Sequence, residues 1–125
     1  MRKNWNSEAK WESIFGQSRA VQIGNFFEIS STNAYEGSKI IGFADITLQT
    51  EYIIKKIEFT LLEAGFDLSH VIRTRIYVTD ISLWEEVAAV YSYLFKNIMP
   101  ASSIVQVSKL IHPDILIEIE ATAVK

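Results

Sequence analysis

Two carboxylates on one face of the last predicted strand are the first candidates for chemistry. Residues 115–124 alternate strictly, so that Glu118 and Glu120 lie on one face and Ile117 and Ile119 on the other. A carboxylate in a partly shielded site can orient water or accept a proton, as a general base does. The structural alternative is a pair of solvated or interface carboxylates, balanced by cations such as Arg73, Arg75 and Lys109. The residues alone leave both interpretations open.

Other catalytic groupings have weaker support. The residue types of a serine hydrolase are present in Ser102, Ser103, Glu118 and His112. No glycines of a nucleophile elbow surround these serines, which argues against that class. His70 and His112 lie in predicted loops without the spacing of zinc ligands, and the chain contains no cysteine. No glycine-rich phosphate loop occurs, so we expect neither a metal nor another cofactor.

Composition and charge narrow the class of protein. With 125 residues, of which 49% are hydrophobic, the chain is long enough for one domain over residues 1–125 with its own core. A net charge of −3 without any Lys/Arg-rich run argues against a nucleic-acid partner. The first residues lack the apolar segment of a secretory signal, and no apolar run approaches the ~20 residues of a membrane helix. We therefore expect a cytoplasmic protein without a membrane partner.

Hydrophobic periodicity predicts the elements that position these residues. Gly24-Asn25 is a two-residue hairpin signal between apolar runs at 19–23 and 26–31. Helical spacing predicts two helices, one over 45–64 with Asp45 as N-cap and Gly65 as stop, and one over 82–97 with a capping box from Ser82 to Glu85. The other predictions are an irregular N-terminal arm at 1–15, a loop or short irregular strand at 33–42, and strands at 71–79, 103–110 and 115–124.

The order β-β-α-β-α-β-β predicts an α+β fold with both helices on one face of a mixed sheet. Two helices cannot cover both faces of such a sheet, although its strands carry apolar residues on both. Another copy of the same chain is the simplest cover for the second face. We therefore expect a symmetric homo-oligomer with sheet faces turned inward.

Four segments carry a pattern that is specific in combination. They are GQSRAV at 16–21, RTRIYVTD at 73–80, PASSIVQV at 100–107 and IEIEA at 117–121. Together with the element order they resemble the RidA family, also called the YjgF or reactive intermediate deaminase family. The resemblance implies a chorismate-mutase-like fold and a homotrimer with clefts between subunits. It also implies hydrolysis of small enamines and imines, although other members carry the older labels endoribonuclease L-PSP and translation inhibitor.

The resemblance assigns residues to the cleft. Glu118 takes the position of the glutamate that helps to position water in the deaminases. Ser102 stands where the family motif Pro-Ala-Arg-Ser has an arginine that grips the substrate carboxylate, and a hydroxyl supplies neither the charge nor the fork. Further cleft positions that depart from the deaminase pattern are Gln17 in place of a tyrosine, Ser30-Ser31 in place of Ser-Gly, and Ala88 in place of an asparagine.

Arg19 is the candidate for a replacement cation. It lies two residues after Gln17, so on an extended segment both side chains point to the same side. The chain thus resembles an arginine-less branch, for which we expect a small, anionic metabolite as ligand. Two functions remain open. One is hydrolysis of a small imine, enamine or related C–N compound with water held by Glu118; the other is non-catalytic binding of a metabolite or a protein. RNA cleavage has the least support.

Overall fold

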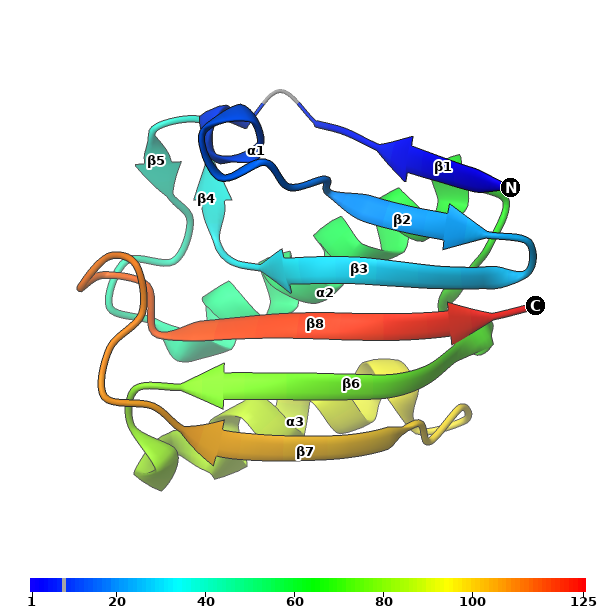
Figure 1. Cartoon of the computed structure of the whole chain (residues 1–125). Helices are drawn as coiled ribbons and strands as arrows, with labels where there is room; N and C mark the ends of the chain where they lie inside the picture. Colours follow the sequence, from blue (N-terminus) through cyan, green and yellow to red (C-terminus); the bar gives the residue numbers. More distant parts are fainter. Residues whose placement is uncertain (8) are drawn as a thin grey trace.

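The computed structural model describes residues 1–7 and 9–125, and its centre is one six-stranded mixed sheet (Figure 1). The strands are β1 (Arg2–Trp5), β2 (Ala20–Ile23), β3 (Phe26–Thr32), β6 (Val71–Val78), β7 (Ala101–Gln106) and β8 (Ile117–Val124). They lie in the order β1-β2-β3-β8-β6-β7, and every neighbouring pair is antiparallel except β6 and β7. The architecture is α+β, as the sequence predicts, although β7 begins and ends earlier than the predicted strand.

Both long helices lie on the same face of the sheet, behind it in Figure 1. α2 (Ile46–Glu63) begins at the predicted N-cap Asp45, whose side chain accepts a hydrogen bond from the backbone N–H of Leu48 at 3.1 Å. α3 (Trp84–Phe95) packs beside it. The smaller elements are α1 (Lys10–Phe15), the hairpin of β4 (Tyr35–Glu36) and β5 (Lys39–Ile40), and 3₁₀ turns at Leu68–His70 and Ile81–Leu83. Within the described residues, no helix has the length and apolar character to cross a bilayer.

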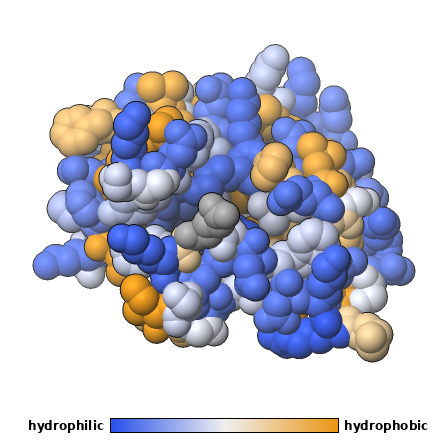
Figure 2. All heavy atoms as spheres, turned by 90° about the horizontal axis from the view of Figure 1, so that it is seen from above, coloured by the Kyte–Doolittle hydropathy of each residue, from blue (hydrophilic) through white to orange (hydrophobic). Residues whose placement is uncertain are grey.

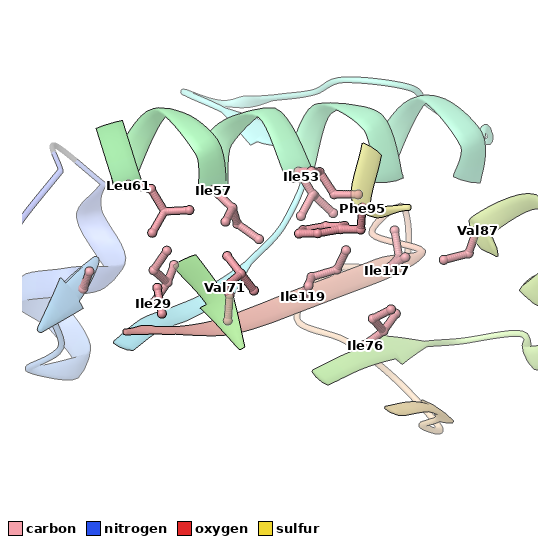
Figure 3. Close-up of a cluster of buried hydrophobic side chains, with 14 of the residues drawn as sticks. Ile29, Ile53, Ile57, Leu61, Val71, Ile76, Val87, Phe95, Ile117 and Ile119 are labelled. Atoms are coloured by element: carbon pink, nitrogen blue, oxygen red, sulfur yellow. The ribbon is translucent and has the colours of Figure 1, made fainter. Parts of the chain in front are cut away.

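The core lies between these two helices and the sheet (Figure 3). β8 contributes Ile117 and Ile119, which are at most 1% exposed, and α2 contributes Ile53 and Ile57. Burying an aliphatic side chain of this size contributes roughly 1.5–3 kcal/mol relative to leaving it in water. The predicted alternation of β8 is therefore the feature that selects which face meets the helices.

The opposite face of the sheet has no helix over it in the part of the chain that the structure describes. Glu118 and Glu120 lie on this face, in register with Tyr77 and Arg75 of β6. The register places apolar side chains on the same face that remain about half exposed, namely Ile23, Phe26 and Val105. Cover of this face by another copy of the chain stays a prediction.

The irregular arm expected over residues 1–15 is wrong, because this segment contains β1 and α1. β1 extends the sheet by pairing with β2. Trp5 anchors it: the ring meets Phe27 edge-on with 6.3 Å between centroids, and its Nε1 donates to Gln22 Oε1 at 3.1 Å. A short polar strand held by one aromatic residue offers little periodicity to detect.

Viewed from the β1 edge of the sheet, the surface of the molecule is mostly hydrophilic with separate hydrophobic groups (Figure 2).

The capping box predicted from Ser82 to Glu85 is also wrong. A 3₁₀ turn precedes α3, and its N-cap is Asp80. Asp80 Oδ1 accepts hydrogen bonds from the backbone N–H of Ser82 at 3.0 Å and from the Ser82 hydroxyl at 2.6 Å. Leu83, at the start of α3 itself, makes no side-chain cap. The Ser82 hydroxyl therefore donates to Asp80, whereas a capping box requires it to accept from the helix.

Replacing Asp80 by alanine should lower the melting temperature at pH 7, because two donors of Ser82 lose their acceptor. These hydrogen bonds lower the pKa of Asp80 below its usual 3.8. The stabilisation is therefore present above that pH and is lost as the pH falls through the lowered pKa. Thermal melts by circular dichroism should show the gap to the wild type closing in acid. Glu85→Ala is the matched control. An equal loss of melting temperature in both variants would support the capping box from Ser82 to Glu85 and contradict the role of Asp80.

Candidate functional site

Glu118 lies near the start of β8 on the uncovered face of the sheet and is half-buried. Asn33, which follows β3, donates from Nδ2 to Glu118 Oε2 at 3.1 Å. No hydrogen bond within the described residues reaches the other carboxylate oxygen. A carboxylate held by one oxygen can accept a hydrogen bond from water with the other, or take a proton there.

Arg19 precedes β2 and forms hydrogen bonds to an irregular part of β3. Its Nη2 donates to the carbonyl oxygens of Ser30 and Ser31, at 2.7 and 3.1 Å, and to Thr32 Oγ1 at 2.7 Å. The register between β3 and β8 shifts between Ile29 and Thr32, so the two serines form a bulge whose carbonyls need other donors. The guanidinium supplies them. Nη2 of Arg19 is therefore committed to its own chain, whereas the buried Nε has no hydrogen-bond partner among the described residues.

A second cation, Lys56 of α2, supports the segment that carries Asn33. Its Nζ donates to the carbonyl oxygens of Asn33 at 3.0 Å and Tyr35 at 2.9 Å. Burial, followed by the positive charge of Arg19, lowers the pKa of Lys56 to about 8. Burial also lowers the pKa of Arg19, an effect that acidic neighbours including Glu118 partly offset. Arg19 thus lies close enough to Glu118 for their charges to interact, whereas the carboxylate that acts on Lys56 is Glu36.

Ser102 and Ala88 lie elsewhere, where α3 packs over β7. Ser102 is in register with the buried Thr74, so its side chain is on the helix-facing side of the sheet. Three hydroxyls meet there in a triangle. The oxygen of Tyr91 is 2.5 Å from that of Ser102 and 2.6 Å from that of Thr74, and Thr74 donates to Ser102 at 2.8 Å.

Two members of this hydroxyl triangle, Tyr91 and Ser102, border a pocket of about 180 Å³ between α3 and β7. We call it the α3–β7 pocket. The rest of its lining is apolar except for Ser103, and consists of Ile76, Trp84, Val87, Ala88 and Ile104. None of these lining side chains carries a charge. The pocket therefore offers an apolar volume with hydroxyl groups at its border.

The predicted site residues fall into two groups that do not meet within one chain. The first group comprises Glu118, Arg19, Ser30 and Ser31; the second comprises Ser102 and Ala88. The register of the sheet places Glu118 and Ser102 on opposite faces. Gln17 belongs to neither group, because its exposed side chain borders a separate hollow beside Glu12 of α1.

Asn33, Thr74 and Tyr91 are not among the site residues predicted from the sequence. Tyr91 lies three residues after Ala88 on the same helical face, so the helical spacing alone could have linked it to the same pocket. Thr74 follows from the pairing of β6 with β7. The partnership of Asn33 and Glu118 spans 85 residues, and no spacing rule joins them.

Glu120 has the structural role that was the alternative interpretation for the carboxylate pair. Tyr77 donates its hydroxyl to Glu120 Oε1 at 3.0 Å, and Arg75 Nη1 lies 3.8 Å from the same oxygen. Burial, with the hydrogen bond to Glu120, raises the pKa of Tyr77. Arg73 donates to the hydroxyl of Ser103 at 2.9 Å. The two arginines are thus engaged within the sheet.

His112 is not arranged as the base of a serine hydrolase. Its Nδ1 accepts a hydrogen bond from the backbone N–H of Asp114 at 3.0 Å, and its ring meets Tyr35 edge-on. The hydroxyl of Ser102 bonds to Thr74 and Tyr91 instead. His112-Pro113-Asp114 therefore acts as the turn that the sequence indicates.

Known proteins share this fold and much of the sequence. The family model for Endoribonuclease L-PSP matches residues 8–125. A RutC family protein of Pyrococcus abyssi is 35% identical over 111 residues, which cover 86% of this chain and 85% of that protein. The crystal structure of Rv2704 from Mycobacterium tuberculosis, a member of the YjgF/YER057c/UK114 family, is 42% identical with a TM-score of 0.90 and full coverage of both chains. The YjgF gene product of Escherichia coli is 26% identical with a TM-score of 0.85 over 98% of each chain.

These matches define a YjgF-type α+β fold built on a mixed six-stranded sheet. The chain belongs to the YjgF/RidA family, which also carries the names Endoribonuclease L-PSP and RutC. The resemblance inferred from the four sequence segments is therefore confirmed at the level of the family.

Arg19→Met should destabilise the protein by roughly 2–3 kcal/mol, because Ser30, Ser31 and Thr32 lose a charged donor in a half-buried place. Arg19→Lys should recover part of the loss, since an ammonium group can still donate. Urea unfolding at one protein concentration measures the difference. Arg2→Met, on the exposed first strand, is the matched control, and a loss no larger than in this control would show that the bulge does not depend on Arg19.

Lys56 should make stability rise with pH between about 8 and 10.5, its native and ordinary pKa values. In this window the unfolded chain binds more protons than the native chain, so the cost of burying the charged amine is relieved as pH rises. As the pH rises from about 8 to 10.5, the unfolding free energy of the wild type should therefore increase relative to that of Lys56→Met. Lys55→Met, at an exposed position of the same helix, is the control. A pH-independent difference would contradict the lowered pKa.

Proposed function

We propose that the protein hydrolyses a small imine, enamine or related C–N compound at a site formed between copies of the chain in a homotrimer. The observation that carries this proposal is the separation of the two candidate groups. Glu118 faces one side of the sheet and the α3–β7 pocket opens on the other, so both can serve one ligand only where copies meet. Membership of the family and the uncovered apolar side chains of the sheet, such as Phe26 and Val105, support the same assembly.

The reaction needs one oriented water and one proton acceptor. Glu118, held by Asn33, accepts a hydrogen bond from the water and takes its proton as the oxygen attacks the imine carbon. The same carboxyl then returns the proton to the nitrogen. In the second stage the carboxylate takes the hydroxyl proton of the tetrahedral carbinolamine and delivers it to the nitrogen as the C–N bond breaks. The products are a carbonyl compound and ammonia or an amine, so atoms and charge balance without a cofactor.

Ser102 distinguishes this chain from members that grip a substrate carboxylate with arginine. Its hydroxyl is engaged with Thr74 and Tyr91, and it has no positive charge. We infer that the chain belongs to an arginine-less branch whose substrate is held in another way. Nη2 of Arg19 already makes three hydrogen bonds to its own chain, so this nitrogen does not supply a prong of the missing fork.

The second candidate function is non-catalytic binding of a small metabolite or a partner protein. The closed hydroxyl triangle favours it, because all three groups already have partners without a substrate. A binding module would retain the α3–β7 pocket and would not need Glu118. RNA cleavage is less favoured, since a net charge of −3 provides little attraction for a polyanion.

Imines released in situ provide the test of hydrolysis. A serine dehydratase supplies 2-aminoacrylate, and a flavin amine oxidase supplies an uncharged imine from a primary amine. The protein should accelerate the release of the carbonyl product from at least one source above the uncatalysed rate. Glu118→Gln should reduce that acceleration about 100-fold or more, whereas the matched variant Glu120→Gln should keep most of it.

Three outcomes would overturn the proposal. If neither source is accelerated, the binding function takes its place. If Glu118→Gln and Glu120→Gln lose activity equally, Glu118 has no special role. Light scattering on the same samples should give three times the mass of the chain, and a stable monomer at micromolar concentration would remove the shared site.

A further inference from the structure

The α3–β7 pocket combines apolar walls with polar groups that carry no charge. Trp84, Val87 and Ile104 form apolar walls, and the polar groups at its border are uncharged hydroxyls. A carboxylate moved from water into such surroundings without a partner cation loses several kcal/mol of solvation. An uncharged carbonyl or amide loses far less, and a single hydroxyl donor can compensate it.

The hydroxyl triangle can provide that donor. Tyr91 and Ser102 border the pocket, while Thr74 lies buried behind them at 1% exposure. Ser102 accepts from Thr74 and donates to the carbonyl oxygen of Pro100 at 3.2 Å. Because a hydroxyl proton can rotate, Ser102 can turn its O–H from Pro100 toward a ligand while it continues to accept from Thr74. The triangle is therefore suited to one neutral acceptor and does not match the two-pronged charge of a carboxylate.

Cations near the pocket do not change this balance. Arg73 reaches the hydroxyl of Ser103, but the sheet register places Arg73 on the opposite face from Ser102. In the proposed assembly, a neighbouring copy brings Arg19 with Glu118, and Lys56 lies close enough to Arg19 for their charges to interact. Lys56 Nζ is bound to the carbonyl oxygens of Asn33 and Tyr35. Arg19 Nη2 is bound to the β3 bulge, and the charges of Glu12 and Glu118 oppose that of Arg19, which weakens its attraction for an anion.

The volume of the pocket limits the size of the apolar group. Its 180 Å³ is slightly more than the ~150 Å³ of an apolar cavity that takes up benzene. The ring of Trp84 and the ring of Tyr91 both border it. A flat ring or a short branched alkyl group therefore fits, and a long chain does not.

We propose that the α3–β7 pocket binds a small uncharged carbonyl, amide or imine compound with a ring-sized or branched apolar group, and discriminates against carboxylates. The inference rests on the proposed function only in assigning this pocket to the substrate; the preference itself is a property of the chain's own residues. It replaces the anionic ligand expected from the sequence by a neutral one.

Benzamide and benzoate are the matched probes, because they have nearly the same shape and differ in charge. Calorimetry on the full chain should give a dissociation constant at least 10-fold lower for benzamide, with a shift of the Trp84 indole N–H signal in NMR spectra. Ser102→Arg should reverse the preference. Ala88→Phe should fill the pocket and abolish binding of both probes, and Trp84→Ala should weaken benzamide if the first variant fails to fold.

The contrary results are equally specific. Equal or tighter binding of benzoate by the wild type, no binding of benzamide, or benzamide binding that survives Ala88→Phe would each overturn the inference. Arg73→Met is the control for a cation behind the sheet, and it should leave the ratio of the two affinities unchanged. If the protein hydrolyses no imine but still binds benzamide more tightly than benzoate, only the proposed reaction is contradicted.

If the protein hydrolyses 2-aminoacrylate and binds benzoate more tightly than benzamide, only the preference of the pocket for a neutral ligand is contradicted.

Discussion

The register of β8 is the constraint on which the positions of both candidate groups depend. β8 lies between β3 and β6, so every other strand is placed relative to it. A slip of one residue would turn Ile117 and Ile119 to the uncovered face and bring Glu118 and Glu120 under the helices. Both changes are costly, since the isoleucines lose their burial and the carboxylates lose their solvation without gaining a cation. Apolar packing on one face of β8 therefore fixes the chemistry on the other.

The cations near Glu118 act mainly on the backbone. Arg19 binds the carbonyl groups of the β3 bulge, and Lys56 binds those of Asn33 and Tyr35. They hold the segment that presents Asn33 to Glu118. Of the two, Arg19 interacts with the charge of Glu118 without a hydrogen bond to it. A ligand anion at Nη2 of Arg19 would have to compete with the hydrogen bonds that hold the β3 bulge. In the proposed site, Nη2 therefore does not take the place of an arginine at position 102.

Elements with a hydrophobic pattern that repeats over many residues were predictable from the sequence. Short elements and contacts between residues far apart in the chain were not. The spacing of Ile53 and Ile57 identifies α2, and the alternation through Glu118 identifies β8, because each pattern repeats over many residues. β1 is four residues long and depends on Trp5 meeting Phe27, a contact that no local pattern announces. The cap before α3 was misassigned because Asp80 and Ser82 both have capping side chains, and only the 3₁₀ turn decides between them. The family resemblance named Glu118 and Ser102, but it could not show that they face opposite sides of the sheet.

That separation has a consequence for the symmetry of the proposed assembly. If one surface of each copy presents Glu118 and another presents the α3–β7 pocket, a head-to-tail contact joins unlike surfaces. In a linear row of copies joined in this way, the first copy and the last copy would each have one of these two surfaces without a partner. Only a closed ring pairs every Glu118 surface with an α3–β7 pocket. A closed trimer of this kind would hold three equivalent sites. In each site, one copy would contribute the Glu118 surface and the next copy the α3–β7 pocket. The apolar side chains of the uncovered sheet face favour closure, because a ring that turns these faces inward removes them from water. In the proposed trimer, completion of the site and burial of the sheet face would be the same event, and a variant that weakens the contact between copies would lose both together.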